Sequence, residues 1–433
     1  MCFYKPLTPI YLLMTERYFK ILFALLLVSS FVTAQVIVDA ELRPRFEYRH
    51  GFQNLLPDNV DAAAFISQRT RLNAGYADEK LDFYLSLQDI RVWGDVPQLN
   101  VADRNGLGIH QVWGELRFTP KIALKLGRQV LDYDDQRILG GVDWAQQARS
   151  HDVALLKFET DRSAIHFGAG FNQDGESLTE TTLTTTTYKA LQYIWLHRDW
   201  ESLGASLLFL NNGLQYIDEA NEANNGTRYS QTLGTHLKYC KGNFGVTSNI
   251  YYQFGKDVND NTLRAYLLGL EASYGLRPNW ALQVGGELQS GNDNGAPANG
   301  DNKAFGPLYG TNHKFNGLMD YFYVGNHANN VGLLDLYMGT TIKTGKKTGL
   351  NIRLHHLNAA ADLIGTSSKN LGTEADLVFN YNFTQTITIK AGYSQLFASE
   401  GMEILKNNFD DNQNCWGWAM VTIKPTLFKN QFK

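Results

Sequence analysis

The feature that most constrains this chain is a period-two alternation of polar and apolar side chains. In residues 38–49 every odd position is charged and nearly every even position is apolar, as Glu41 and Arg43 beside Leu42 illustrate. Successive side chains of a strand point to opposite faces, so this segment predicts a strand with one charged and one apolar face. Such a strand fits a soluble sheet over a core, or a membrane barrel around a wet lumen.

The number and spacing of these segments distinguish the two architectures. About 18 of them follow one another, near the roughly 9–11 residues that cross a bilayer as a tilted strand, and they span 36–50, 65–77, 80–93, 110–119, 121–130, 150–160, 163–173, 186–198, 200–212, 227–240, 242–256, 262–275, 278–291, 331–344, 347–358, 370–383, 386–398 and 414–425. Brief connections such as 78–79 alternate with long ones such as 131–149 and 292–330. Outer-membrane barrels have short periplasmic turns and long outer loops. We therefore predict an all-β transmembrane antiparallel barrel of about 18 strands.

The first residues have the composition of an export signal. A basic segment that begins at Met14, a plain candidate for the true start, precedes an apolar run at 21–32, and small residues end at Ala34. This order is typical of a signal peptide, and the apolar run is too short for a good membrane-spanning helix. We expect a signal peptide at 1–34 and a single outer-membrane barrel domain at 35–433, in the outer membrane of a Gram-negative bacterium.

Composition and motifs argue against several other classes of protein. The formal net charge is -4 with no basic tail, so nucleic acid is not an expected partner. Cys240 and Cys415 form no metal-ligand motif, and we expect them to lie too far apart for a disulfide. The acidic residues of segment 131–149 lack the spacing of a calcium loop. No nucleophile-elbow or zinc-protease motif occurs. We therefore expect that the protein is not an enzyme and that it has no catalytic residue, metal or cofactor.

Arginines are concentrated in the first five predicted strands, mostly in the inward phase. Arginine binds carboxylates through one or two charge-assisted hydrogen bonds, so an arginine-lined wall would attract anions. Alternatively, the arginines form cross-strand ion pairs with nearby acidic residues such as Glu41, Glu47 and Glu115, and only stiffen the wall. The predicted pore-lining residues are Arg43, Arg45, Arg49, Arg69, Arg71, Arg91, Arg117, Arg128 and, later in the chain, Arg353.

One stretch resembles a known family. LGRQ at 126–129, followed by YDDQRILGGVDW at 133–144 and a polar run into a strand, is similar to the alginate-export family of outer-membrane porins. The resemblance implies a large antiparallel barrel, a monomer in outer-membrane lipid, that passes an anionic uronate polymer. Because no energy source is encoded, transport runs down a gradient or is driven by a periplasmic export partner. The residues in matching motif positions are Arg128, Gln129, Asp135, Gln136, Arg137, Gly140, Gly141, Asp143 and Trp144.

Several alternatives stay open from the sequence. The expected function is passive diffusion or export of anionic, uronate-like oligo- or polysaccharide or of small anionic solutes. A general or phosphate-type anion porin with weak selectivity, a barrel enzyme and a plugged structural barrel are the alternatives. Segment 131–149 either folds into the barrel or lies across its rim. Segment 292–330 either gates the pore or stays at the surface, and we favour the surface arrangement because the segment is rich in Gly and Asn.

Overall fold

The computed structural model describes residues 34–57, 59–99, 106–322, 330–409 and 414–432. Eighteen long antiparallel strands form the wall of one closed barrel. They are β1 (Ala34–His50), β2 (Ala63–Ala77), β3 (Leu81–Val92), β4 (Gly108–Thr119), β5 (Ile122–Gln129), β6 (His151–Glu159), β7 (Ser163–Phe171), β8 (Ala190–Asp199), β9 (Leu203–Tyr216), β10 (Gly226–Lys241), β11 (Phe244–Lys256), β12 (Thr262–Arg277), β13 (Trp280–Gln289), β15 (Leu333–Ile342), β16 (Thr348–Asn358), β17 (Asn370–Asn382), β18 (Ile387–Ala398) and β19 (Cys415–Ile423). The predicted strands are confirmed, each within a few residues.

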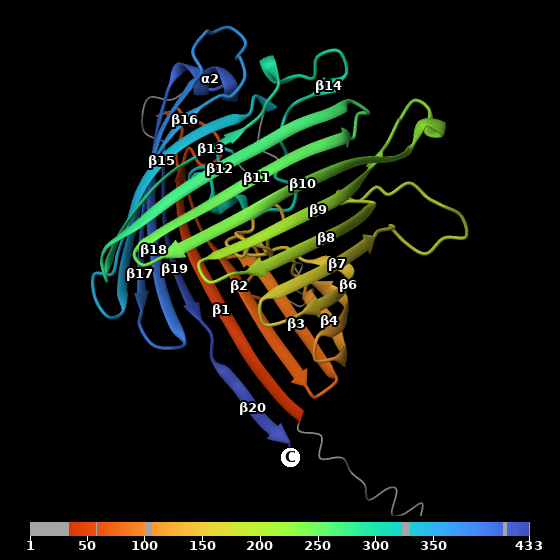
Figure 1. The fold of residues 1–433 in the computed structure, drawn as a ribbon. Helices are drawn as coiled ribbons and strands as arrows, with labels where there is room; N and C mark the ends of the chain where they lie inside the picture. The colour runs from red at the N-terminus through yellow and green to blue at the C-terminus, as the bar shows by residue number, and fades with distance from the viewer. Residues whose placement is uncertain (1–33, 58, 100–105, 323–329, 410–413, 433) are drawn as a thin grey trace, which may run out of the picture.

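Each strand pairs with its neighbours in the sequence, and β1 pairs with β19 to close the barrel (Figure 1). Beyond a bulge, β20 (Thr426–Phe432) continues this last strand along the first residues of β1. The two-residue strand β14 (Asp301–Asn302) joins the edge of β12 from a loop. Short helical segments occur only in the outer connections: η1 (Glu222–Asn224), η2 (Asp293–Gly295), η3 (Asn312–Lys314) and α2 (Glu400–Lys406) within the described residues.

The alternation of side chains separates an apolar outer surface from a polar lumen. On β2, Leu72 is 46% exposed on the outside, whereas its neighbour Arg71 is buried within the lumen. Large apolar side chains that face outward, such as Phe167 and Leu268, recur on other strands. This outward band suits lipid, since charged side chains there are destabilising. In the described part of the chain, no helix is long and apolar enough to span a membrane.

Two outer connections fold into the barrel and fill much of its lumen. We call residues 130–150, between β5 and β6, the inner loop, and residues 290–332, between β13 and β15, the long loop. The inner loop buries Ile138 and Leu139, and the long loop buries Met319 and Tyr321. The surface arrangement that we favoured for the long loop is therefore wrong for its described residues 305–322, because apolar positions of the wall and the inner loop give it an interior to pack against.

Most of the predicted signal peptide and part of the long loop lie outside the described residues. Of the predicted signal peptide at 1–34, residues 1–33 are outside the described residues, and so are 323–329 of the long loop. The two mature cysteines are free, as expected: Cys240 is exposed at the lower end of β10, and Cys415 is partly buried at the upper end of β19.

Candidate functional site

The inner loop folds inward because the wall beneath it is apolar on its lumen side. Leu208 and Leu210 of β9 face the lumen and are buried, while Leu207 and Phe209 face outward. A strand that is apolar on both faces must be covered on both. Lipid covers the outer face, and the inner loop covers the inner face with side chains that include Leu131, Tyr133, Ile138 and Leu139. The run of apolar residues at 207–210, which interrupts the polar–apolar alternation, was the sequence signal for a covered lumen face.

The tip of the inner loop lies against arginines of β1 and β2. Arg43 donates from Nε to the Gln146 side chain (3.0 Å) and from Nη1 to the Asp143 backbone oxygen (2.8 Å). Arg69 donates from Nη2 to Asp143 Oδ1 (2.9 Å) and from Nε to Glu41 (2.8 Å). The arginines thus do what each of the two hypotheses predicts. Arg69 makes a cross-strand ion pair with Glu41, and it also binds an anion, the carboxylate of Asp143.

Asp143 is the anion that these arginines share. Its carboxylate is 68% exposed to water although Arg43, Arg69 and Arg71 all lie within 4.0 Å of it. Because Asp143 lies inside the barrel, partial removal from bulk water acts to raise its pKa, but the charges of Arg69 and Arg43 outweigh this effect and lower the pKa below its ordinary value. Nη2 of Arg71 is buried and has no hydrogen-bond partner among the described residues. The three guanidinium groups therefore carry more hydrogen-bond donors than Asp143 alone satisfies.

Trp144 of the inner loop is held between charged and aromatic groups. The guanidinium of Arg45 lies 4.1 Å from the centre of the Trp144 ring, and the ring of His313 stacks on it with centroids 4.5 Å apart. Trp416 and Trp418 of β19 meet the same ring edge to face. Because His313 belongs to the long loop, Trp144 joins both loops to the barrel wall.

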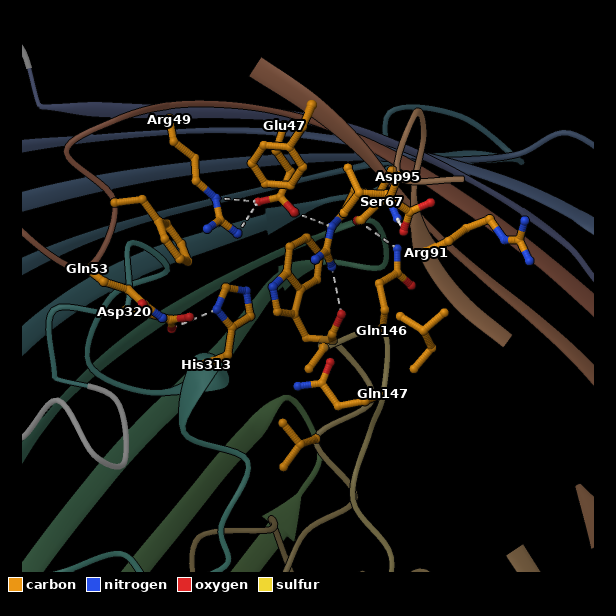
Figure 2. Close-up of a pocket in the computed structure, with 18 residues that line it drawn as sticks. Glu47, Arg49, Gln53, Ser67, Arg91, Asp95, Gln146, Gln147, His313 and Asp320 are labelled. Carbon is orange, nitrogen blue, oxygen red and sulfur yellow. Dashed lines mark hydrogen bonds and ion pairs between the residues drawn. The ribbon is translucent and has the colours of Figure 1, made fainter. Parts of the chain in front are cut away.

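A cavity of about 460 Å³ lies between the β1–β3 wall and the two loops. Figure 2 shows Glu47 and Arg49 along one edge, with Gln146 of the inner loop and His313 of the long loop across from them. Rings of Phe52, Phe65 and Trp144 complete its lining. Cationic groups beside aromatic faces and hydrogen-bonding amides suit a ligand with carboxylates, hydroxyls and apolar ring faces.

The remaining predicted arginines divide between the lumen and the outer surface. Arg117 faces the lumen near the periplasmic end, where it pairs with Asp82, and Arg353 pairs with Glu271 across the lumen wall (3.1 Å). Arg128 departs from the expected inward phase, and Arg91 does so only in part. Arg128 shares its face with Leu126 and pairs with Asp152 (2.8 Å), while the adjacent Gln129 is buried in the lumen.

Arg91 lies near the upper end of β3. It pairs with Asp89 (2.7 Å) and is in register with Gln68, which alternates with lumen-facing Ser67 and Arg69. The register gives Arg91 the outward face of β3, and at this end of the strand the residue also borders the first cavity (Figure 2).

The other motif residues of the inner loop hold it to its surroundings. Asp135 accepts a hydrogen bond from Asn249 of β11 (2.6 Å), and the backbone oxygen of Gln136 accepts one from Thr311 of the long loop (2.9 Å). Gly140 packs so closely on Thr311 that a Cβ atom would collide with it. Gln129 donates to Val153 of β6 (3.1 Å), and Arg137 and Gly141 are buried beside these contacts.

The lumen wall across from the arginines carries both acidic and basic side chains, with Lys238 and Arg353 beside three carboxylates. A second cavity of about 420 Å³ lies against β10–β13, β15 and β16, and its lining includes Glu271, Glu287 and Asp335. Asp335 is fully buried and meets His355 Nδ1 at 2.9 Å. No group of three or more His, Cys, Asp or Glu residues with metal-binding geometry occurs in the residues that the structure covers.

A closed barrel with an apolar outer band, a polar lumen and loops folded into that lumen defines an outer-membrane channel of the porin type. Among solved structures, the chain is similar to OpdO of Pseudomonas aeruginosa, with a TM-score of 0.60 and 13% identity over 91% of this chain and 98% of that chain. OccK9 (OpdG) of the same organism has a TM-score of 0.61 at 12% identity, covering 90% and 98%. OccAB4 of Acinetobacter baumannii has a TM-score of 0.58 at 15% identity, covering 92% and 98%.

The chain belongs to the Alginate export family, whose pattern matches residues 34–404. No curated protein matches the chain at a significant level. Family and fold together identify a channel in the outer membrane of a Gram-negative bacterium, and not an enzyme. The predicted family, fold and location are confirmed.

Proposed function

We propose that this channel passes anionic, uronate-like oligosaccharides by passive diffusion, and that they bind in the cavity beside the arginines of β1 and β2. The observation that supports this most strongly is Asp143, a water-exposed carboxylate held by three arginines. A uronate presents a carboxylate of the same kind, and the cavity offers it the neighbouring guanidinium groups of Arg45 and Arg49. The proposal keeps the chain as a monomer in outer-membrane lipid, with a periplasmic export partner that supplies the saccharide.

Two further features support a saccharide over a small inorganic anion. The cavity of about 460 Å³ has more room than a single small anion would occupy. The ring of Phe52 in its lining lies 4.1 Å from the guanidinium of Arg49. Sugar rings have apolar faces that pack on aromatic side chains, whereas their hydroxyls hydrogen-bond to groups such as Gln146 and Ser67. Phosphate or chloride would use the arginines alone.

A general anion porin with weak selectivity is the second candidate. It is favoured by the pairing of lumen arginines with carboxylates, as in Arg45 with Glu47 (2.9 Å) and Arg49 with Glu47 (2.8 Å). Pairing reduces the net positive potential that an entering anion meets. The two candidates differ in whether the length and charge of a saccharide affect its binding.

Channel block in planar bilayers tests the proposal. Oligo-uronates and neutral oligosaccharides of equal length are added to the reconstituted protein, and the block of single-channel current is measured. We expect uronates to block more strongly, and Arg49→Gln to weaken that block by about tenfold, since one charge-assisted hydrogen bond is removed.

The matched control is Arg353→Gln, which removes a lumen arginine on the opposite wall, outside the first cavity. It should leave the uronate block within about twofold of the unchanged protein. Equal block by neutral and uronate saccharides would contradict the proposal and favour the general porin.

A further inference from the structure

Three short turns between β10 and β16 carry basic side chains without acidic ones, at the end of the barrel where the short turns lie (Figure 1). The turns are 242–243, 278–279 and 343–347, and no Asp or Glu occurs in them or in the five residues on either side, apart from the lumen residue Glu271 further up β12. We call the five basic residues of these turns and of the adjoining strand ends the basic rim. They are Lys241, Arg277, Lys343, Lys346 and Lys347, and all five are exposed.

The turns of the basic rim lie side by side. The first two are adjacent because β11 pairs with β12 down to the turns. The second meets the third through a backbone hydrogen bond from Lys343 N to Asn279 O (2.8 Å). At the far side, Lys347 Nζ donates to Phe383 O just beyond β17 (2.9 Å). Five cations therefore follow one arc of the barrel end.

The charges of the basic rim are not neutralised within the protein. In the part of the chain that the structure describes, none of its five side chains forms an ion pair with a carboxylate. By contrast, the short turns that follow β2, β6 and β8 carry acidic residues, including Asp78, Asp161 and Glu201. A cluster of one sign of charge creates a local potential that attracts counter-ions. The basic rim is therefore suited to an anionic partner.

Aromatic side chains on the outer face show where the membrane surface crosses the same strand ends. Phe244, Tyr274 and Trp280 are exposed in the outward phase of β11, β12 and β13, and such rings concentrate at the membrane–water interface. Each ring is three residues from Lys241 or Arg277. At a rise of about 3.3 Å per residue and a tilt of about 40°, this is about 8 Å along the membrane normal. The polar layer outside the hydrocarbon is roughly 5–8 Å thick, so the basic rim lies at the level of the lipid phosphates.

We propose that the basic rim binds the phosphate groups of anionic phospholipids in the periplasmic leaflet of the outer membrane. Long lysine and arginine stems can lie along apolar surface while their charged ends reach a phosphate. Clustered basic residues beside a membrane attract anionic lipid. Anionic lipid then gathers against β10–β16 and not around the whole barrel. This inference goes beyond the proposed function, because lipid on the outside of the barrel is independent of the solute in its lumen.

Native mass spectrometry of the detergent-solubilised protein tests the lipid site. Phosphatidylglycerol and phosphatidylcholine with the same acyl chains are titrated separately, and the unchanged protein should bind phosphatidylglycerol at least about tenfold more tightly. A triple variant, Lys343→Gln with Lys346→Gln and Lys347→Gln, should lose at least about fivefold in phosphatidylglycerol affinity, because three phosphate-pairing charges are removed. Its phosphatidylcholine affinity should stay within about twofold. Heat-modifiable gel migration shows that the variant is folded.

The matched control removes the same charge from short turns in the other half of the barrel. Lys80→Gln, Lys121→Gln and Arg162→Gln are combined, and the phosphatidylglycerol affinity should stay within about twofold of that of the unchanged protein. Equal affinity of the unchanged protein for the two lipids would overturn the proposal. Equal losses in the two triple variants would also overturn it, since only the total charge would then matter.

The uronate block in planar bilayers separates lipid from solute. The triple variant of the basic rim should keep this block within about twofold, because none of its three lysines lines the first cavity. A weaker uronate block together with unchanged phosphatidylglycerol affinity would assign the basic rim to the solute and overturn the proposal. Failure of uronates to block the unchanged protein would contradict the proposed function alone, because the lipid titration contains no saccharide.

Discussion

At the scale of single residues, Asp143 determines how the inner loop meets the barrel. Two separate strands provide its cationic neighbours, Arg43 from β1 and Arg69 from β2. A carboxylate with a lowered folded-state pKa stabilises the docked loop above its ordinary pKa of about 4, and this stabilisation is lost as the pH falls through the lowered value. The loop contact should therefore weaken only in acid, below about pH 4.

The first prediction concerns this pH dependence. We expect the channel to open more often as the pH falls below about 4, because protonated Asp143 no longer pairs with the arginines. Asp143→Asn should open more often already at pH 7 and should lose the acid step. Bilayer recordings between pH 3 and pH 7 measure both effects. A variant with the acid step intact would show that another group is responsible.

At the scale of elements, α2 is a seven-residue helix that would not be stable alone. It is held over β17 and β18 because it buries Met402 and Leu405 in the same apolar cluster as Met319 of the long loop. Lys406 ends the helix and donates to Tyr321 O (2.7 Å). The helix thus fastens the long loop from above, an arrangement that the polar sequence around it does not reveal.

The second prediction follows from Lys406. Burial lowers the pKa of Lys406 to about 8. Between that value and the ordinary lysine pKa of about 10.4, the undocked helix binds more protons than the docked one, so docking becomes more stable as the pH rises. Hydrogen exchange of α2, corrected for the intrinsic effect of pH, should show greater protection at pH 9.5 than at pH 7. Lys406→Met should remove this difference.

At the scale of the whole molecule, the barrel separates two environments by its strand ends. Short turns lie at one end with both termini of the barrel, and the long loops and α2 lie at the other (Figure 1). Cys240 and Cys415 mark these opposite ends, and both are free.

The third prediction tests this orientation. A membrane-impermeant thiol reagent should not label Cys240 in intact cells of a Cys415→Ser variant, and should label it once the outer membrane is permeabilised. The exposed Cys240 thiol gives a strong signal, because it is not shielded by the fold. Labelling of Cys240 in intact cells would reverse the assignment of periplasmic and outer ends.

The sequence by itself determined the barrel, because each strand encodes its two environments locally. A period of two, of which Leu42 between Glu41 and Arg43 is one instance, specifies a lipid face and a wet face without reference to the rest of the chain. The register was less secure. Arg128 was assigned to the pore wall, but its register with Val112 gives it the outward face that Leu126 shares, since local composition does not fix a one-residue shift.

Only the tertiary structure decided what fills the lumen. Arg43 meets Asp143 100 residues later, and Arg137 meets Glu287 150 residues later, so no local pattern predicts either pair. Inward Leu208 and Leu210 indicate that something apolar covers them, but not which loop does so. Closing the barrel brings these distant groups to one place, and their pairing then determines which loops enter the pore and which arginines face the solute.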